Sequence, residues 1–225
     1  HNREHFDRRG ILAINLMSSP GSGKTALLEA TLTALKNEFT CAVIEGDLET
    51  ENDAERIRAL GVTAHQIVTG TACHLDAHLV HDALHHMNLD GVDVLFIENV
   101  GNLVCPASFD LGQHLNVTLL SVTEGDDKPA KYPVMFRAAD AMLLTKTDLL
   151  AVLDDFDPDQ AEAHLRNLAN PAPVLRLSAR KNLGMDAWLA WLREQLAAQR
   201  ARVAIGQSRR PAIQSDGQTF HSASA

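Results

Sequence analysis

The segment 18–25 reads SSPGSGKT, and its residue types and spacing are those of a phosphate-binding loop. Gly21 and Gly23 let the backbone come close to phosphate oxygens, so that successive N–H groups form an anion-binding nest. The Lys24 ammonium would neutralise the β- and γ-phosphates, and the Thr25 hydroxyl would bind Mg²⁺. The sequence departs from the pattern G-x-x-x-x-G-K-[ST] only at Ser18, which occupies the position of the first glycine. The predicted nucleotide contacts of this loop are Gly21, Ser22, Gly23, Lys24, Thr25 and Ala26.

Two elements must position this loop. The apolar run Ile11–Met17 predicts a buried strand, and leucines at helical spacing predict a helix over 24–38. The helix N-terminus adds partial positive charge beside the loop. A Gly/Ser turn before a helix is the plain alternative, but the strand, the loop, Lys24 and Thr25 together favour nucleotide binding.

Acidic residues follow two later strands. Glu45–Asp47 ends the second predicted strand, and Glu98–Gly101 ends the fourth. Because ligands bind at the carboxyl ends of parallel strands, we expect Asp47 and Glu98 near Mg²⁺ or the attacking water. Gly101 would sense the γ-phosphate. The predicted catalytic residues are Lys24, Asp47 and Glu98, and the predicted Mg²⁺ ligands are Thr25 and Asp47.

Two further strand ends have the residues of a guanine site. Thr145–Asp148 reads TKTD and is similar to the guanine-reading N-K-x-D motif, with Thr145 in place of Asn. Asp148 can accept both the N1–H and the 2-amino N–H of guanine, a pair that adenine does not offer. Ser178 and Ala179 follow the last predicted strand and would support guanine O6 through a backbone N–H. We therefore expect GTP rather than ATP, with base contacts from Lys146, Asp148, Ser178 and Ala179.

Three residues have the chemistry of soft-metal ligands. Cys73 and His74 stand at the start of a helix predicted over 73–87, and Cys105 follows the γ-phosphate-sensing segment. Thiolate and imidazole bind Ni²⁺ and Zn²⁺ well, and a fourth ligand would be water, a carboxylate or a residue of a second subunit. An isolated cysteine can equally be a small buried hydrophobe. The position of Cys105 favours a metal site that responds to the nucleotide.

Three more histidines, His78, His81 and His85, continue from His74 along one side of the predicted helix. A solvated polar face is the favoured interpretation of this stripe, and an auxiliary, weak metal surface is the alternative.

Apolar strands that alternate with helical patterns predict an α/β fold of the P-loop NTPase type, a mostly parallel sheet with helices on both faces. The predicted strands are 11–17, 40–45, 64–68, 92–97, 117–122, 141–145 and 173–177. The predicted helices are 24–38, 52–60, 73–87, 131–138, 158–169 and 184–203. We divide the chain into an N-terminal lead segment (1–10), a P-loop GTPase domain with an embedded metal site (11–203) and a disordered tail (204–225).

The composition of the chain argues against some classes of partner and cellular compartment. The net charge of −9 over 225 residues argues against nucleic acid. No apolar run has the length needed to span a membrane. The three widely spaced cysteines do not suggest a disulfide framework and fit a reducing cytoplasm.

Taken together, these segments resemble the HypB family of nickel-incorporation GTPases, which act in NiFe-hydrogenase maturation. The resemblance covers roughly residues 3–196, and its most specific parts are TGTACHLDA (69–77) and FIENVGNLVCPASFDLG (96–112). It implies a SIMIBI-class fold, Mg²⁺-dependent GTP hydrolysis and a homodimer whose formation depends on the nucleotide. It also implies Ni²⁺ or Zn²⁺ held by Cys73, His74 and Cys105 at the dimer interface. The implied partners are a HypA-like metallochaperone, the hydrogenase large subunit and, for some members, SlyD.

Three alternatives remain at the level of sequence. A UreG-like urease accessory GTPase would usually have Cys-Pro-His where this chain has Cys105-Pro106-Ala107. A P-loop kinase for a small molecule is disfavoured by the guanine-site segments. A metal store with a vestigial nucleotide site would bind metal regardless of GTP.

Overall fold

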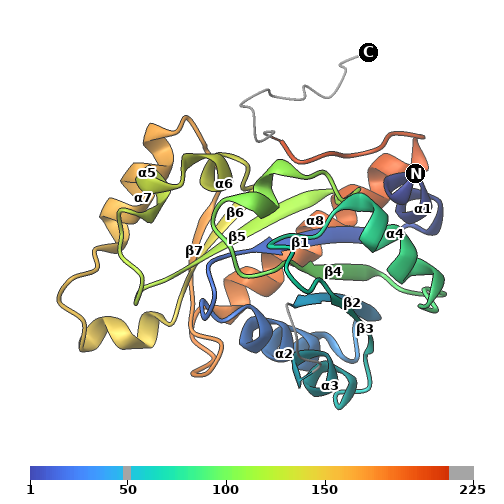
Figure 1. The fold of residues 1–225 in the computed structure, drawn as a ribbon, viewed down its shortest axis with the longest axis horizontal. Helices are drawn as coiled ribbons and strands as arrows, with labels where there is room; N and C mark the ends of the chain where they lie inside the picture. The colour runs from blue at the N-terminus through green and yellow to red at the C-terminus, as the bar shows by residue number, and fades with distance from the viewer. Residues whose placement is uncertain (48–51, 213–225) are drawn as a thin grey trace.

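A seven-stranded parallel sheet between two helical layers forms the framework of the chain (Figure 1). The computed structural model describes residues 1–47 and 52–212. The strands lie in the order β3-β2-β4-β1-β5-β6-β7. Their bounds are β1 (Leu12–Met17), β2 (Cys41–Asp47), β3 (Thr63–Val68), β4 (Val94–Glu98), β5 (Leu115–Ser121), β6 (Ala141–Thr145) and β7 (Val174–Arg176). The predicted parallel α/β fold is confirmed.

Helices cover both faces of this sheet. One face packs against α2, α3 and α8, and the other packs against α1 and α4 beside β4 and against α6 and α7 beside β6. The helices are α1 (Asn2–Arg9), α2 (Lys24–Leu35), α3 (Asn52–Arg58), α4 (Ala77–His85), α5 (Lys128–Lys131), α6 (Pro133–Arg137), α7 (Pro158–Asn167) and α8 (Met185–Ala204). Two 3-10 turns, η1 (Cys105–Ser108) and η2 (Thr147–Ala151), follow the strand ends. None of the helices in residues 1–47 and 52–212 combines the length and apolar character needed to cross a bilayer.

The central position of β1 places the phosphate loop in the middle of the sheet. All six residues of β1 are buried, as expected for a strand covered by helices on both faces. Its neighbours are β4 on one side and β5 on the other, so the strand order reverses beside it. Behind the loop, the fully buried Trp188 of α8 donates a hydrogen bond from Nε1 to Thr31 Oγ1 of α2 at 2.9 Å. This contact joins two helices of the same layer under the site.

Two predicted helices differ from the observed ones for local reasons. The helix predicted over 73–87 begins only at Ala77, because the Asp76 carboxylate accepts hydrogen bonds from the backbone N–H groups of His78 and Leu79 and so caps the first turn. Cys73 and His74 therefore lie in a loop, not on a helix. The helix predicted over 131–138 corresponds to α6, and a separate short helix, α5, precedes it. The two are interrupted at Tyr132, since Pro133 lacks an N–H and keeps the residue before it out of helical geometry.

Both ends of the chain differ from the predicted lead segment and tail. Residues 2–9 form α1, whose Phe6 side chain is fully buried against the sheet layer. After α8, Ser208 donates a hydrogen bond to Asp7, and the backbone N–H of Ala212 donates one to Asp140. In the structure, residues 205–212 of the predicted tail thus make polar contacts with the domain. Residues 213–225 of the predicted tail lie outside the described residues.

Candidate nucleotide and metal sites

The phosphate loop joins β1 to α2 with the geometry that its glycines predict. Gly21 and Gly23 have φ angles of 75° and 96°, a left-handed conformation that other residues adopt at a cost. Lys24 is buried, and its Nζ donates a hydrogen bond to Ser18 Oγ at 3.0 Å. The departure from the usual glycine at position 18 therefore has a role, since the hydroxyl binds the loop lysine.

A carboxylate that follows the end of β5 fixes the outer side of the same loop. Glu124 accepts hydrogen bonds from the hydroxyl groups of Ser19 and Ser22, the second at 2.7 Å. The backbone N–H of Ser121 donates to the same Glu124 carboxylate at 2.8 Å. Glu124 thus ties the phosphate loop to the end of the neighbouring strand and limits the conformations that the loop can adopt.

Two buried carboxylates face each other at the ends of β2 and β4. Glu45 and Glu98 are register partners and are only 2% and 5% exposed. Burial, and then the neighbouring Glu98, raises the pKa of Glu45 to about 10. Burial also raises the pKa of Glu98, against the opposing effect of Lys24, whose Nζ lies 4.0 Å from Glu98 Oε1. The pair therefore retains a proton at neutral pH unless a cation binds beside it.

The donor set around these carboxylates fits Mg²⁺. The Thr25 hydroxyl lies 3.1 Å from both Glu98 Oε1 and Asp53 Oδ2. Glu45 Oε1 is buried and makes no hydrogen bond within the part of the chain that the structure describes. Hydroxyl and carboxylate oxygens are the ligands that Mg²⁺ prefers. All of these residues, together with Asp47, line one cavity of about 380 Å³.

A second cavity of about 300 Å³ adjoins the first and shares Gly23 and Ala26 with it. Its lining includes the predicted base-site residues Lys146, Asp148, Ser178 and Ala179. Thr145 Oγ1 donates to Ser22 O at 2.7 Å, and Lys146 Nζ donates to Gly21 O at 2.6 Å. The strand end that would read the base is thus bonded directly to the phosphate loop.

The loop after β4 packs against the phosphate loop without room for a side chain. A Cβ on Gly101 would lie 2.9 Å from the backbone of Pro20, so only glycine fits there. The next residue, Asn102, donates its backbone N–H to Ser18 O at 2.8 Å. The phosphate loop and the loop after β4 are therefore in direct backbone contact.

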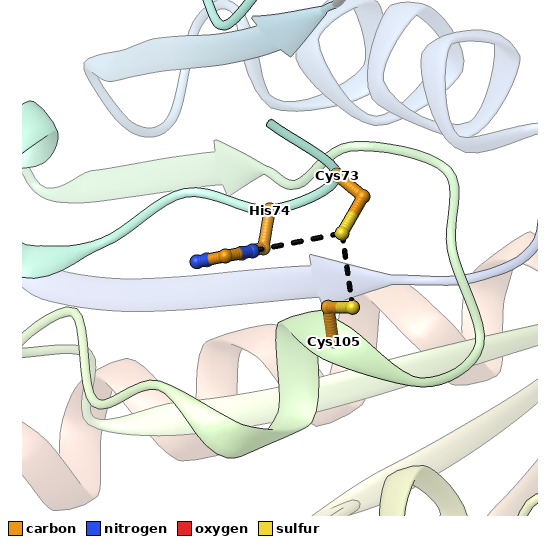
Figure 2. Close-up of side chains that lie close together, drawn as sticks. All are labelled: Cys73, His74 and Cys105. Atoms are coloured by element: carbon orange, nitrogen blue, oxygen red, sulfur yellow. Dashed lines mark hydrogen bonds between the residues drawn. The ribbon is translucent and has the colours of Figure 1, made fainter. Parts of the chain in front are cut away.

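Cys73, His74 and Cys105 come together although 30 residues separate His74 from Cys105 (Figure 2). The Sγ atoms of the two cysteines are 2.9 Å apart, and Cys73 Sγ lies 3.7 Å from His74 Nδ1. The three ligand atoms all lie within 4.8 Å of one another. The hydrogen bond with Cys73 raises the pKa of the Cys105 thiol. The imidazole of His74 stacks on Phe109 with the ring centroids 3.9 Å apart, which fixes the orientation of the ring. The arrangement could supply three of the four ligands that a tetrahedral site needs.

Comparison with known proteins agrees with this geometry. The model of the CobW/HypB/UreG nucleotide-binding domain matches residues 12–176. The hydrogenase maturation factor HypB of Escherichia coli (strain K12) is 55% identical over 197 residues, which are 88% of this chain and 68% of that protein. The chain belongs to the HypB proteins of this family.

Two solved HypB structures have the same fold. HypB from Helicobacter pylori, crystallised in complex with nickel, is 42% identical and gives a TM-score of 0.82 over 87% of this chain and 92% of that one. The hydrogenase maturation factor HypB from Archaeoglobus fulgidus is 39% identical, with a TM-score of 0.80 over 87% of this chain and 95% of that one. The chain spans about two thirds of the length of the E. coli relative.

Within this HypB fold, the predicted nucleotide residues line the two adjoining cavities and the predicted metal ligands meet at one point. Sequence reasoning missed two carboxylates that contact the loop, Asp53 and Glu124. Glu124 lies in the stretch SVTEGDDKPAKYP, which has no spacing that marks a role. Asp53 stands in an acidic run on α3, and only the folded chain brings it to Thr25.

Proposed function

We propose that this chain is a GTP-hydrolysing metallochaperone that assists nickel insertion into NiFe-hydrogenase during maturation. The observation that carries the proposal is the hydrogen-bonded connection between the phosphate loop and the Cys73–His74–Cys105 cluster, described below. The names of its relatives support hydrogenase as the protein that is matured and nickel as the metal: the E. coli protein is a hydrogenase maturation factor, and the H. pylori structure is a complex with nickel.

Two asparagines form the connection. Asn102 donates to Ser18 O through its backbone, while its side-chain Oδ1 accepts the backbone N–H of Cys105 at 3.2 Å. Asn99 follows the buried Glu98, and its Oδ1 accepts the backbone N–H of Leu75, the residue after His74, at 3.1 Å. Each cysteine-bearing loop is thus one asparagine away from the nucleotide cavity. A shift of the γ-phosphate contacts would move Cys105 relative to Cys73 and His74.

The phosphate end of the cavity supports hydrolysis of a nucleoside triphosphate. Lys24 would leave Ser18 for the β- and γ-phosphate oxygens and stabilise the charge that grows on them in the transition state. Asp47 and Glu98 would orient the attacking water. Mg²⁺, held by Thr25 and the neighbouring carboxylates, would supply further positive charge to the same phosphates. Gly101 would meet the γ-phosphate through its backbone, because it has no side chain to intervene.

The second cavity supports guanine as the base. Asp148 would accept the N1–H and the 2-amino N–H, and Ser178 and Ala179 would present a backbone N–H to O6. The Lys146 side chain lies along the phosphate loop, within 3.9 Å of a Cβ built on Gly23, and would cover one face of the base. Because each unmatched buried hydrogen bond costs about 1–3 kcal/mol, adenine would bind more weakly.

A homodimer would complete the metal site. The cluster offers three ligands. Two apolar side chains near Cys105 in the sequence are exposed: Val104, which is 58% exposed, and Phe109, which is 38% exposed. Such a surface favours contact with a second copy of the chain, whose cluster would supply the missing ligand to Ni²⁺ or Zn²⁺. The further partners we propose are a HypA-like metallochaperone, the hydrogenase large subunit and SlyD, all in the cytoplasm.

The proposal is tested by measuring Ni²⁺ affinity and dimer fraction in GDP and in a non-hydrolysable GTP analogue. We expect the two nucleotides to give different affinities in the parent chain, and Cys105→Ala to lose both the binding and the difference. Cys41→Ala is the matched control, because burial raises the pKa of the Cys41 thiol to about 12 and keeps it protonated. Equal affinity in both nucleotides would refute the coupling, while binding by Cys105→Ala as tight as the parent's would refute the ligand set.

Phosphate release from GTP without any acceptor separates this function from a small-molecule kinase. We expect slow release that requires Mg²⁺. A kinase would consume almost no GTP until its phosphate acceptor is added.

A further inference from the structure

Helix α1 lies beside α4 (Figure 1), and a second group of imidazoles gathers on these two neighbouring elements. His81 and His85 lie one turn apart on α4, and their Nε2 atoms are 3.1 Å apart. The His1 ring approaches His81 edge-on, with the centroids 4.9 Å apart. His5 lies one turn further along α1. These four histidines come from α1, the residue that precedes it and α4.

The distance between the two α4 imidazoles suits a chelated ion. A metal–imidazole bond is about 2.0–2.1 Å long, so two Nε2 atoms 3.1 Å apart would subtend roughly 95–100° at one ion. This angle lies between the octahedral and the tetrahedral values. Residues four apart on a helix hold that spacing without any movement of the backbone. The pair is therefore already arranged as a bidentate ligand.

The surroundings leave room for the rest of a coordination shell. A cavity of about 470 Å³ lies beside the group and includes His1, His78 and His81 in its lining. The acidic residue of that cavity, Asp110, is paired with Arg3 at 2.6 Å, so imidazoles are its remaining ligating groups. On α1, Arg9 Nη1 lies 3.4 Å from His5 Nδ1, and its positive charge would repel a metal ion bound at His5. The α4 pair is thus the centre of the group, and water can complete the shell.

We propose that His81 and His85 bind a divalent transition-metal ion, Ni²⁺ or Zn²⁺, through their Nε2 atoms, with water completing the coordination shell. In the hydrogen-bonded pair one ring carries its proton on Nε2. Metal binding requires the neutral tautomer with the proton on Nδ1 in both rings, so one proton moves from Nε2 to Nδ1 through solvent and none is lost. Imidazole nitrogen suits both ions.

The test uses the full chain with Cys73→Ser and Cys105→Ser, which removes the thiolate site, and Ni²⁺ alone as the titrant in calorimetry. This background should retain about one equivalent of Ni²⁺ per chain. Adding H81A and H85A should abolish this Ni²⁺ binding or lower its affinity at least tenfold, since loss of even an outer-shell partner of a ligand costs about 10–100-fold in affinity. The matched control adds H86A and H164A, two histidines outside the pair. Circular dichroism confirms that each variant is folded.

Unchanged Ni²⁺ binding in the H81A/H85A background would overturn the proposal, as would an equal loss in the H86A/H164A control. The exposed His85 offers a milder variant, H85A, which should weaken binding while the fold is preserved. In an otherwise unaltered chain, H81A/H85A should keep GTP hydrolysis and the thiolate-to-nickel absorption of the cysteine site. Failure of this site and failure of the proposed function are therefore distinguishable.

Discussion

Replacing Glu45 by Gln should make the nucleotide-free protein more stable at neutral pH. The Glu45 carboxyl has an ordinary pKa of 4.5, which burial and the facing Glu98 raise to about 10. Folding at pH 7 therefore requires Glu45 to take up a proton that the unfolded chain does not bind. Each pH unit corresponds to about 1.4 kcal/mol, so this uptake costs roughly 3 kcal/mol at pH 7 and less than about 1 kcal/mol at pH 5. Gln has nearly the same shape and carries no such cost.

The sign follows from the raised pKa. Stability from the protonated carboxyl is fully present below pH 4.5 and is lost as the pH rises towards 10. The gain from Glu45→Gln should therefore be largest in alkaline solution and nearly vanish at pH 5.

Urea unfolding of parent and variant, at pH 5 and pH 7.5 without Mg²⁺ or nucleotide, measures this difference. Glu194→Gln, on the exposed side of α8, is the matched control and should change stability little at either pH. A Glu45→Gln variant that is less stable than the parent by the same amount at both pH values would refute the reasoning, because the effect would then come from packing and not from a proton.

Three further substitutions test the proposed site. Lys24→Ala should lower the rate of GTP hydrolysis at least about 100-fold, since a fixed charge on the transition state is lost, and unchanged turnover would contradict the assignment. Asp148→Asn should shift binding from GTP towards the xanthine nucleotide in a competition assay, because the new amide donates where the carboxylate accepted; equal binding of GTP and ATP by the parent would argue against a guanine site. Asn102→Ala should reduce the ratio of Ni²⁺ affinities in the two nucleotide states towards one, from the 5–150-fold typical of coupled sites, while leaving hydrolysis measurable. An unchanged ratio of Ni²⁺ affinities in Asn102→Ala would show that the coupling does not depend on Asn102.

The sequence predicts best where one local segment determines the geometry. The phosphate loop needs a strand, two glycines and a helix start in a fixed order, and all three are visible between Leu12 and Leu35. The same holds for the alternating apolar runs that become parallel strands. By contrast, the contact of Asp53 with Thr25 and that of Glu124 with Ser22 depend on residues 28 and 102 positions apart. No periodicity encodes such distances.

Local competition explains the other differences. Cys73 and His74 precede a good amphipathic pattern, so a helix over 73–87 is a reasonable prediction, but the cap at Asp76 satisfies the first N–H groups and sets the start three residues after His74. The tail after α8 is polar and poor in large apolar residues, which indicates disorder. Hydrogen bonds to Asp7 and Asp140 nevertheless fix residues as far as Ala212, and composition alone does not reveal such partners.

The start of α4 at Ala77 has a consequence for metal choice. On a helix, two successive side chains would be held about 100° apart around the axis, and the ion would have to accept that angle. In the loop, the Cys73 side chain can turn with little backbone cost, whereas stacking on Phe109 holds the imidazole of His74. Ni²⁺ and Zn²⁺ favour different geometries, square planar and tetrahedral, and rotation of the Cys73 side chain would let this pair of ligands adapt to both. A metal site of this kind would take part of its shape from the ion, so under the proposed function selection between the two metals would fall to the protein that delivers the ion and to the nucleotide state.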